Sequence, residues 1–308
     1  MKIRADSFIT KLVVLFLFLT SYPYRSESVG QDTTVPLIIN ELLARVPSDN
    51  PDTAEIEGDA NGDSQRDASL DEFVELVNVG KEPLDVSGFE VDDGGTMGSF
   101  IFPMRTIIPP GEAVVIFGGG DLTKSRLEFA NARALDLVFA VGGGAGLGFS
   151  DSGDAVVVRD RMGREVARFD YDGEMPVPQL VFQSFNRNPD MRGPFRNHSE
   201  IEGAGGRLLS PGTWVDGRAF RRTVTNLMPA SGPLEGGNEV VVNGAGFGSE
   251  ISSVTFGDQA ASGLSRISPL ELSVVAPGGG EAGPVDVVIK DQFGEIVARS
   301  AYRFREGY

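Results

Sequence analysis

The chain has 308 residues, of which 41% are hydrophobic, with 40 glycines, 18 prolines, no cysteine and a formal net charge of −17. The lack of cysteine excludes disulfides, thiolate catalysis and cysteine-ligated zinc. The acidic balance excludes nucleic acid as an expected partner, because phosphate backbones carry the same sign of charge. A single histidine, His198, excludes any site that needs several histidines.

The first 28 residues predict a secretory signal peptide, 1–28. Lys2, Arg4 and Lys11 form a positive segment, and a continuous apolar run follows from Leu12 to Leu19. That run is too short for a hydrocarbon core ~30 Å thick, which needs about 20 residues. We therefore expect a secreted or cell-surface protein with no membrane span after signal cleavage. An uncleaved N-terminal anchor is the alternative.

Strand patterns follow the signal segment. Residues 35–44 and 72–80 mix apolar and β-branched residues, and residues 113–117 read AVVIF, a buried strand. The clearest hairpin lies within 147–172, with Gly163 in a turn that requires a positive φ. The best candidate for a short helix is 123–131.

The residue composition and the spacing of strand patterns change along the second half of the chain. Residues 173–221 are rich in Pro, Gly and Asn, which favours a long ordered cap of strands and loops that ends in a linker near 218–222. From Thr223 onward, short strand patterns recur roughly every ten residues with turn clusters between them. That spacing is typical of a small β-sandwich.

The C-terminal segment carries Gly, Pro and Phe motifs in a fixed order: Pro229, Ser231-Gly232-Pro233, Gly236-Gly237, Gly244, Gly246-Phe247 and Phe256-Gly257. On these motifs, residues 222–306 resemble an IPT/TIG domain, which implies an immunoglobulin-like fold.

A second series of motifs fills the preceding part of the chain: IINELLA, DEFVELVNVGKEPLDVSGFEVDD, TIIPPGEAVVIF, GFSDSGDAVVVRD, SFNRNPD and SPGTWVDG. In their order and spacing, residues 35–218 resemble the lamin tail domain of secreted bacterial proteins. The resemblance implies another immunoglobulin-like sandwich. Nothing resembles the coiled-coil rod of nuclear lamins. We expect an all-β protein with two immunoglobulin-like β-sandwich domains in tandem.

Residues 58–73 concentrate carboxylates in one stretch. With Asp59 as position 1 of an EF-hand-type loop, Asn61, Asp63 and Asp67 take positions 3, 5 and 9. Calcium prefers such hard oxygen ligands on a flexible loop. The predicted structural Ca²⁺ ligands are Asp59, Asn61, Asp63, Gln65 through its backbone carbonyl, Asp67 and Asp71.

The stretch also departs from the EF-hand pattern. Ser64 stands where the loop needs Gly, Leu70 stands where it needs Glu, and no flanking helices are expected. A solvated acidic loop is the alternative interpretation. Glu72 belongs either to this loop or to the framework of the following strand.

Other acidic and glycine-rich stretches are interpreted as turns. Asp92, Asp93, Asp151 and Asp154 offer a second ion site, but Asp beside Gly is ordinary turn chemistry. The GGGAGLG stretch at 142–148 lacks the βαβ context of a dinucleotide fingerprint.

His198 with Ser184, Ser199 or a nearby Asp would imitate a nucleophile-and-base pair, but a lone His among Asn and Arg residues is expected to be structural. The basic segment 218–222 is expected to solvate the linker. The aromatic residues of the cap offer a sugar-stacking platform, although packing onto the sandwich is favoured: these are Phe182, Phe185, Phe195 and Trp214.

Both resemblances imply binding or scaffolding modules without an active site. We therefore expect a non-enzymatic binding or adhesion protein, stabilised by calcium, whose partner is an extracellular protein or glycan. The alternative is a carbohydrate-binding accessory protein that works with a secreted hydrolase.

Overall fold

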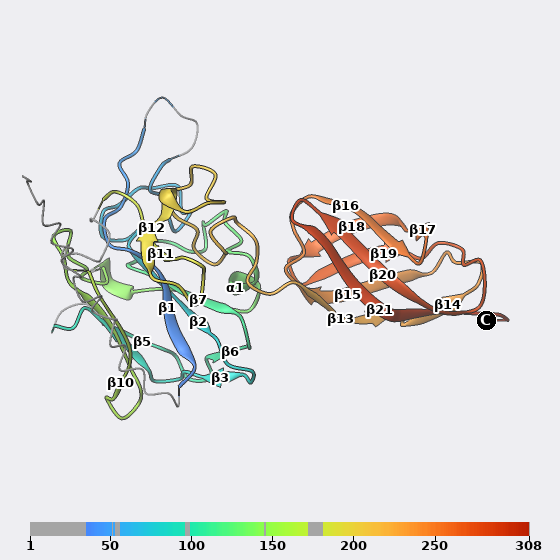
Figure 1. Cartoon of the computed structure of the whole chain (residues 1–308), viewed down its shortest axis with the longest axis horizontal. Helices are drawn as coiled ribbons and strands as arrows, with labels where there is room; N and C mark the ends of the chain where they lie inside the picture. The colour runs from blue at the N-terminus through green and yellow to red at the C-terminus, as the bar shows by residue number, and fades with distance from the viewer. Residues whose placement is uncertain are drawn as a thin grey trace, which may run out of the picture.

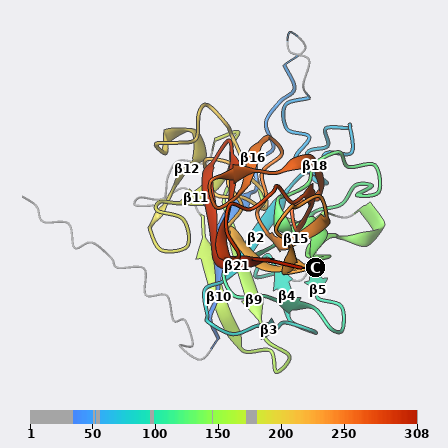
Figure 2. The ribbon, with the colours of Figure 1, turned by 90° about the vertical axis from the view of Figure 1, so that its right-hand side faces the viewer.

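The computed structural model describes residues 35–50, 52, 56–95, 99–144, 146–171 and 181–307. The predicted signal peptide 1–28 lies outside the described residues. Two β-rich domains lie end to end along the long axis, joined by a linker that passes beside α1 (Asn131–Ala134) (Figure 1). Figure 2 shows the C-terminal domain in front of the N-terminal one. The all-β prediction is confirmed.

The N-terminal domain contains two main sheets and a short ladder. The first sheet has the order β12 (Phe195–Asn197), β11 (Phe185–Arg187), β1 (Leu37–Leu43), β2 (Phe73–Asn78), β7 (Ala113–Phe117) and β8 (Val138–Ala140). The second sheet has the order β10 (Glu165–Asp170), β9 (Ala155–Arg159), β4 (Glu90–Asp92) and β5 (Phe100–Ile101). The ladder pairs β3 (Leu84–Asp85) with β6 (Ile107–Ile108).

Both faces of the central strands are covered. Every residue of β1 and β2 is buried, although an outer strand face of a sandwich is normally solvated. The inner faces form the domain core, while Ile38, Val77 and Ala113 pack on the outside against Met191 and Phe220. The segment 181–217, here called the cap, therefore covers the outer face of the first sheet.

The predicted hairpin is confirmed by the pairing of β9 with β10, and Gly163 in its turn has φ 74°. The predicted helix at 123–131 is wrong. Among the residues described, α1 is the one α-helix, and it begins only at Asn131. Phe129 and Ala130 have φ values of 48° and 45°, which a right-handed helix cannot contain.

The C-terminal domain is a second sandwich with its own core. One sheet has the order β13 (Thr223–Met228), β15 (Glu239–Ala245), β19 (Glu271–Val275) and β18 (Ser262–Ser268). The other has the order β14 (Ser231–Pro233), β21 (Gly294–Arg305), β20 (Gly283–Asp291), β16 (Ile251–Phe256) and β17 (Gln259–Ala260). Val242, Leu272, Phe256 and Tyr302 are buried between them.

No helix in the part of the chain that the structure describes has the length and apolar character needed to cross a membrane.

Candidate functional site

The conformation of the acidic loop, residues 58–72, is held by hydrogen bonds between its own side chains and its own backbone. Asp59 Oδ2 accepts a hydrogen bond from the Ser64 N–H at 2.9 Å. Asn61 Oδ1 accepts from the Asp63 N–H, and Asp63 Oδ1 accepts from the Gln65 N–H, both at 2.9 Å. Such Asx turns direct successive Asp and Asn side chains toward the inside of the loop.

Asp71, two residues before β2, closes the loop. Its Oδ1 accepts from the Asn61 N–H at 3.0 Å and its Oδ2 from the Asp67 N–H at 2.7 Å. Burial, together with the charges of Asp59 and Asp63, raises the pKa of Asp71 to about 6 despite these hydrogen bonds. Burial and then the Asp63 charge also raise the pKa of Asp59. The three carboxylates therefore repel one another across a short distance.

One oxygen of this cluster lacks a partner. Asp59 Oδ1 is buried and makes no hydrogen bond of standard geometry, although the Gly62 and Asp63 N–H groups also lower the pKa of this carboxyl. A buried carboxylate oxygen without a partner is costly, because desolvation is not compensated. The donor set around it consists of carboxylate and amide oxygens, which suits a hard divalent cation.

The structure brings together some of the predicted ligands and separates others. Asp67 is exposed, and its Oδ1 caps a turn by accepting from the Ser69 and Leu70 N–H groups at 2.8 and 3.0 Å. These bonds lower its pKa. Gln65 has an exposed side chain. The predicted ligands that the structure brings together are Asp59, Asn61, Asp63 and Asp71. They are linked by hydrogen bonds or by repulsion between their carboxylate charges.

In the conformation described, no three or more His, Asp and Glu side chains of residues 35–307, the gaps given above aside, already stand as ligands of one ion. Their oxygens accept backbone N–H groups instead. A cation would therefore have to replace these backbone N–H groups as the partner of the side-chain oxygens.

A neighbouring loop lies directly over the acidic loop. Asp63 Oδ2 accepts from the Asp121 N–H at 2.9 Å, and Asn61 Nδ2 donates to the Gly119 carbonyl at 3.4 Å. Gly120 has φ 91°, and a Cβ there would lie 2.2 Å from Asn61 Nδ2. Only glycine permits this close approach.

Glu72 lies immediately before β2. Its carboxyl accepts hydrogen bonds from the backbone of Phe149 and Leu147, which lie outside the acidic loop, while the charge of Asp67 in the loop still acts on it. It is only 5% exposed, and burial followed by the Asp151 charge raises its pKa to about 8.

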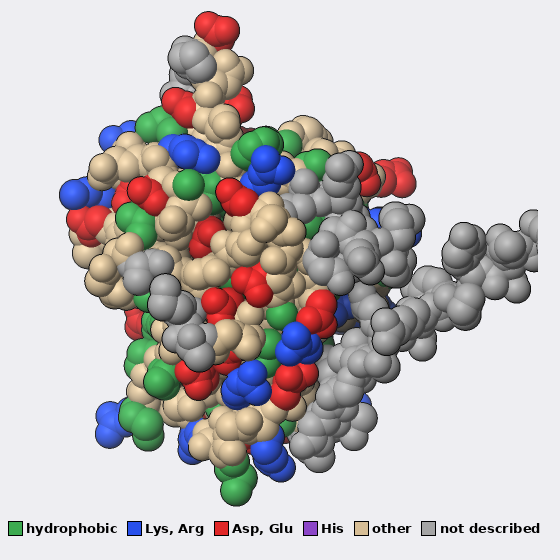
Figure 3. Space-filling view, turned by 90° about the vertical axis from the view of Figure 1, so that its left-hand side faces the viewer, with side chains coloured by type: hydrophobic (Ala, Val, Ile, Leu, Met, Phe, Trp, Pro, Cys, Tyr) green, Lys and Arg blue, Asp and Glu red, His purple; other side chains and the backbone are tan. Residues whose placement is uncertain are grey.

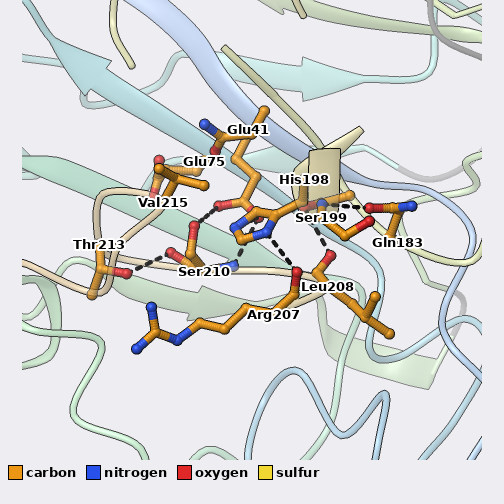
Figure 4. A network of polar contacts seen from close by, with 12 residues as sticks. Glu41, Glu75, Gln183, His198, Ser199, Arg207, Leu208, Ser210, Thr213 and Val215 are labelled. Atoms are coloured by element: carbon orange, nitrogen blue, oxygen red, sulfur yellow. Dashed lines mark hydrogen bonds and ion pairs between the residues drawn. The ribbon is translucent and has the colours of Figure 1, made fainter. Parts of the chain in front are cut away.

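A second polar cluster, which the sequence analysis missed, lies between the first sheet and the cap. Glu41 accepts from Ser184 Oγ at 2.5 Å. It also accepts from the N–H and the hydroxyl of Ser210 at 2.9 Å each (Figure 4). Glu75 accepts from Asn40 Nδ2 at 2.8 Å and from the Gly212 N–H at 2.7 Å. The only sequence signal was an acidic residue inside each strand pattern.

Asp190 extends this network within the cap. It accepts from Asn40 Nδ2 at 3.1 Å, from Asn186 Nδ2 at 2.9 Å and from the Val215 N–H at 3.3 Å. All these side chains are buried. The network therefore fixes the irregular cap to the sheet.

His198 is part of this network and is fully buried. Its Nδ1–H donates to the Arg207 carbonyl at 2.9 Å, and its Nε2 lies 4.0 Å from Glu41 Oε1. Burial lowers its pKa to about 4, so the imidazole is neutral. Ser184 donates to Glu41 rather than to the imidazole. This trio lacks the arrangement and the solvent access of a nucleophile with its base.

Comparison with known proteins decides the identity of the two domains. Residues 32–173 match the family model of the Lamin Tail Domain, and residues 223–304 match that of the IPT/TIG domain. The chain contains a lamin tail domain at residues 32–173, followed by an IPT/TIG domain at residues 223–304. The predicted pair of immunoglobulin-like sandwiches in tandem is confirmed. The cap lies beyond the segment that the lamin tail model matches.

Solved structures show only remote similarity. An auxiliary nutrient binding protein from Bacteroides thetaiotaomicron is 22% identical, with 27% of this chain and 21% of that chain covered and a TM-score of 0.23. SGBP-B from a complex xyloglucan utilization locus in Bacteroides uniformis is 10% identical over 75% and 45%, with a TM-score of 0.25. A DUF4876 family protein from Bacteroides thetaiotaomicron is 14% identical over 62% and 63%, with a TM-score of 0.24.

The chain thus spans about a fifth of the length of the first of these structures. No curated protein sequence matches it.

The aromatic residues of the cap mostly pack the lamin tail domain. Phe185 and Phe195 are buried, and Phe195 stacks on Phe169 with centroids 3.7 Å apart. Trp214 is half-buried against Phe220. Phe182 is the exception, being 47% exposed.

The remaining candidate residues of the lamin tail domain have turn contacts. Asp92 accepts from the Gly94 N–H and pairs with Arg159 at 3.0 Å. Asp93 accepts from the Gly95 N–H at 2.7 Å. Asp154 accepts from the Ala155 N–H at 2.9 Å, and Asp151 is exposed in the same turn region. Residues 142–144 form a glycine turn in which Gly143 and Gly144 have φ values of 86° and 73°.

The basic segment 218–222 makes contacts within the protein. Arg218 pairs with Asp216 at 2.8 Å, and Arg222 pairs with Asp291 of the IPT/TIG domain at 2.5 Å. The segment therefore forms ion pairs with the cap that precedes it and with the IPT/TIG domain that follows it.

Proposed function

We propose that this protein is a secreted or cell-surface, non-enzymatic binding and adhesion protein whose lamin tail domain is stabilised by Ca²⁺ at the acidic loop. The calcium proposal rests on Asp59 Oδ1. This buried carboxylate oxygen makes no hydrogen bond of standard geometry and belongs to the same cluster as the carboxylates of Asp63 and Asp71. A divalent cation would compensate both the missing partner and the mutual repulsion.

The residues that would hold the ion are Asp59, Asn61, Asp63 and Asp71, and the sequence spacing adds the backbone carbonyl of Gln65 as a further candidate. Asp67 is left out because two backbone N–H groups already satisfy its Oδ1. When bound, the ion supplies charge neutralisation and rigidity. The residues of the chain themselves shape the loop through their turns and through the cover of Gly119 to Asp121.

The binding role is supported by the architecture. Both domains are sandwiches, and the conspicuous buried polar cluster at Glu41 holds the cap rather than a substrate. On the end of the lamin tail domain that faces away from the IPT/TIG domain, acidic, basic and apolar side chains are interspersed (Figure 3). Such a mixed surface fits recognition of an extracellular protein or glycan better than recognition of a polyanion.

The experiment is a calcium titration of the protein by calorimetry, with thermal melts in calcium and in chelator. We expect one saturable site and a higher melting temperature in calcium. Asp59→Asn should abolish both, whereas Asp258→Asn, a matched change at an exposed position of the IPT/TIG domain, should change neither. Absence of heat together with identical melts in both buffers would overturn the calcium proposal.

A glycan partner is the second candidate, favoured by the exposed ring of Phe182, over which the Arg45 guanidinium lies at 3.9 Å. Retention on immobilised polysaccharide that is lost in Phe182→Ala and Trp214→Ala would support it. Retention that neither change affects would exclude this surface.

A further inference from the structure

A cleft of about 160 Å³ lies where the two domains meet, beside α1 and the linker (Figure 1). We call it the interdomain cleft. Its lining comes from the segment before α1, from the end of the cap and from the IPT/TIG domain: residues 128 and 130, then 213, 217 and 219, then 246–249, 266, 269, 292 and 293. Both domains contribute to this hollow, and junctions between domains are a frequent place for ligand sites.

Hydrogen bonds between the domains hold the walls of the cleft in place. Asn131 Oδ1 accepts from the Gly246 N–H at 2.7 Å. Arg266 of the IPT/TIG domain donates to both carboxylate oxygens of Glu128 at 2.8 and 2.7 Å, in a bidentate pair. The planar guanidinium fixes the orientation of the two domains as well as their contact. A ligand would therefore meet a preformed site and would not bear the cost of ordering it.

The floor of the cleft offers contact surface and few free polar groups. Its buried members are small or apolar: Ala219, Gly246, Phe247, Gly248 and Pro269. The N–H groups of the two glycines are already bonded, to Asn131 Oδ1 and to Asp291 Oδ2 at 2.7 and 2.9 Å. A Cβ on Gly248 would lie 2.4 Å from Gln292 Oε1, so a larger residue there would displace the rim.

The rim of the cleft is polar and exposed, and it consists of Glu128, Ser249 and Gln292. Gln292 Nε2 donates to Ser249 Oγ at 3.1 Å, and Gln292 Oε1 accepts from the Glu250 N–H at 3.1 Å. A primary amide has two N–H donors. The second N–H of Gln292 and the hydroxyl proton of Ser249 therefore have no partner among the residues described, and both are free to donate to a ligand.

The two charged side chains among the described residues of the lining neutralise each other. Arg266 donates to Glu128 and also to the Phe247 carbonyl, so its guanidinium is committed. A phosphate or carboxylate ligand would find no uncommitted cation here. The Glu128 oxygens keep lone pairs that accept further hydrogen bonds. The cleft thus suits a neutral ligand that both donates and accepts hydrogen bonds.

From these features we infer that the interdomain cleft binds one sugar unit of a neutral glycan. Sugar hydroxyls donate and accept at once, which matches the rim, and the C–H face of a sugar ring matches the floor and the half-buried Phe293. Pockets for drug-sized ligands measure about 300–1,000 Å³, so this smaller cleft fits a single ring. The exposed rim leaves the rest of the glycan chain in solvent.

The inference rests on the proposed binding role and names a ligand class and a site for it. It does not depend on calcium. The cleft is also distinct from the surface of the second candidate, because Phe182 does not belong to its lining.

The probes are cellotetraose, maltotetraose, mannotetraose and galactotetraose, with tetragalacturonate as the anionic counterpart of the last. Saturation-transfer difference NMR detects binding to the full chain, and calorimetry measures the affinity. High salt screens the net charge of the chain, so that the site itself decides the preference. We expect at least one neutral tetrasaccharide to bind and tetragalacturonate to bind more weakly.

Two changes in the rim locate the site. Gln292→Ala removes one hydrogen-bonding group and should weaken binding about threefold to tenfold. Ser249→Phe places a ring in the mouth of the cleft and should abolish binding. Gln259→Ala and Ser252→Phe, at exposed positions of the same domain, are the matched controls and should leave the affinity unchanged. If Ser249→Phe fails to fold, Gln292→Ala still tests the cleft.

The outcomes separate this inference from the proposed function. Binding that Phe182→Ala abolishes and both rim changes leave unaltered would overturn the cleft and support the cap surface. Stronger binding of tetragalacturonate than of galactotetraose would overturn the neutral class. Binding of none of the neutral tetrasaccharides would overturn the inference, while the melts in calcium and chelator would still decide the calcium site.

Discussion

Glu41 and Glu75 are direct partners across β1 and β2, and both are fully buried. Like charges opposite each other in a sheet are unfavourable, and burial makes them more so. Burial raises the pKa of Glu41 to about 7, and burial together with the Glu41 charge raises that of Glu75 well above its usual range. The pair therefore carries a proton at mildly acidic pH.

This pair predicts how stability depends on pH. In the unfolded chain both groups titrate near 4.5, below their folded pKa values, so their contribution is fully present below pH 4.5 and is lost as pH rises through about 7. We expect the melting temperature of the lamin tail domain, measured in chelator, to fall between pH 5 and 8. A drop of at least about 3 °C corresponds to roughly 1 kcal/mol in a domain of this size.

Glu75→Gln should flatten that dependence, because one of the two titrating groups is removed. The measured quantity is the slope of melting temperature against pH. The absolute stability is not used, because the introduced amide also lies against the Gly212 N–H and changes it. Glu82→Gln, at an exposed position, should leave the slope unchanged. A melting temperature that is equal or higher at pH 8 would contradict the argument.

The attachment of the cap depends on Ser210. Ser210→Ala removes the hydroxyl that donates to Glu41 Oε2 in a buried site, and we expect a loss of about 1–3 kcal/mol in the free energy of unfolding. Urea unfolding measures it. Ser199→Ala, at an exposed position of the same cap, should cost less than about 0.5 kcal/mol. Equal losses of unfolding free energy in the two variants would show that the hydrogen bond from Ser210 to Glu41 does not stabilise the cap.

Asp59→Asn should change stability in opposite directions in the two buffers. In chelator the change removes one of three repelling charges, so the melting temperature should stay level or rise. In calcium it removes one of the negative charges that attract the ion, so the melting temperature should fall relative to the unchanged protein. Thermal melts in matched buffers suffice, and a uniform decrease in both would mean that Asp59 acts only through its bond to Ser64.

The close contact at Gly120 can be separated from its backbone conformation. Gly120→Ala places a Cβ against Asn61 at a φ of 91°, whereas Gly111→Ala meets nothing within 4 Å at a φ of 70°. Both changes carry a conformational cost of about 1 kcal/mol, but only the first should displace the acidic loop. We expect Gly120→Ala alone to weaken calcium binding in calorimetry. Equal affinities in the two variants would contradict this role for Gly120.

Local features were readable from the sequence alone. The turn at Gly163, the strand patterns that became β2 and β7, and the glycine and proline motifs of the IPT/TIG domain depend on residues close together in the chain. Backbone φ preferences and strand pairing across a tight turn act over that same short range. The fold class and the order of the domains therefore follow from the sequence.

Contacts between distant segments were decided only by the tertiary structure. Asp67 and Asp71 look equivalent in the sequence, but Asp67 is exposed and accepts from the N–H groups of its own turn, while Asp71 is buried within the acidic loop. Glu41 meets Ser210, 169 residues away, and Asn131 meets Gly246, 115 residues away. No local pattern encodes such pairs, because sheet register and the path of the cap determine which polar groups are buried together.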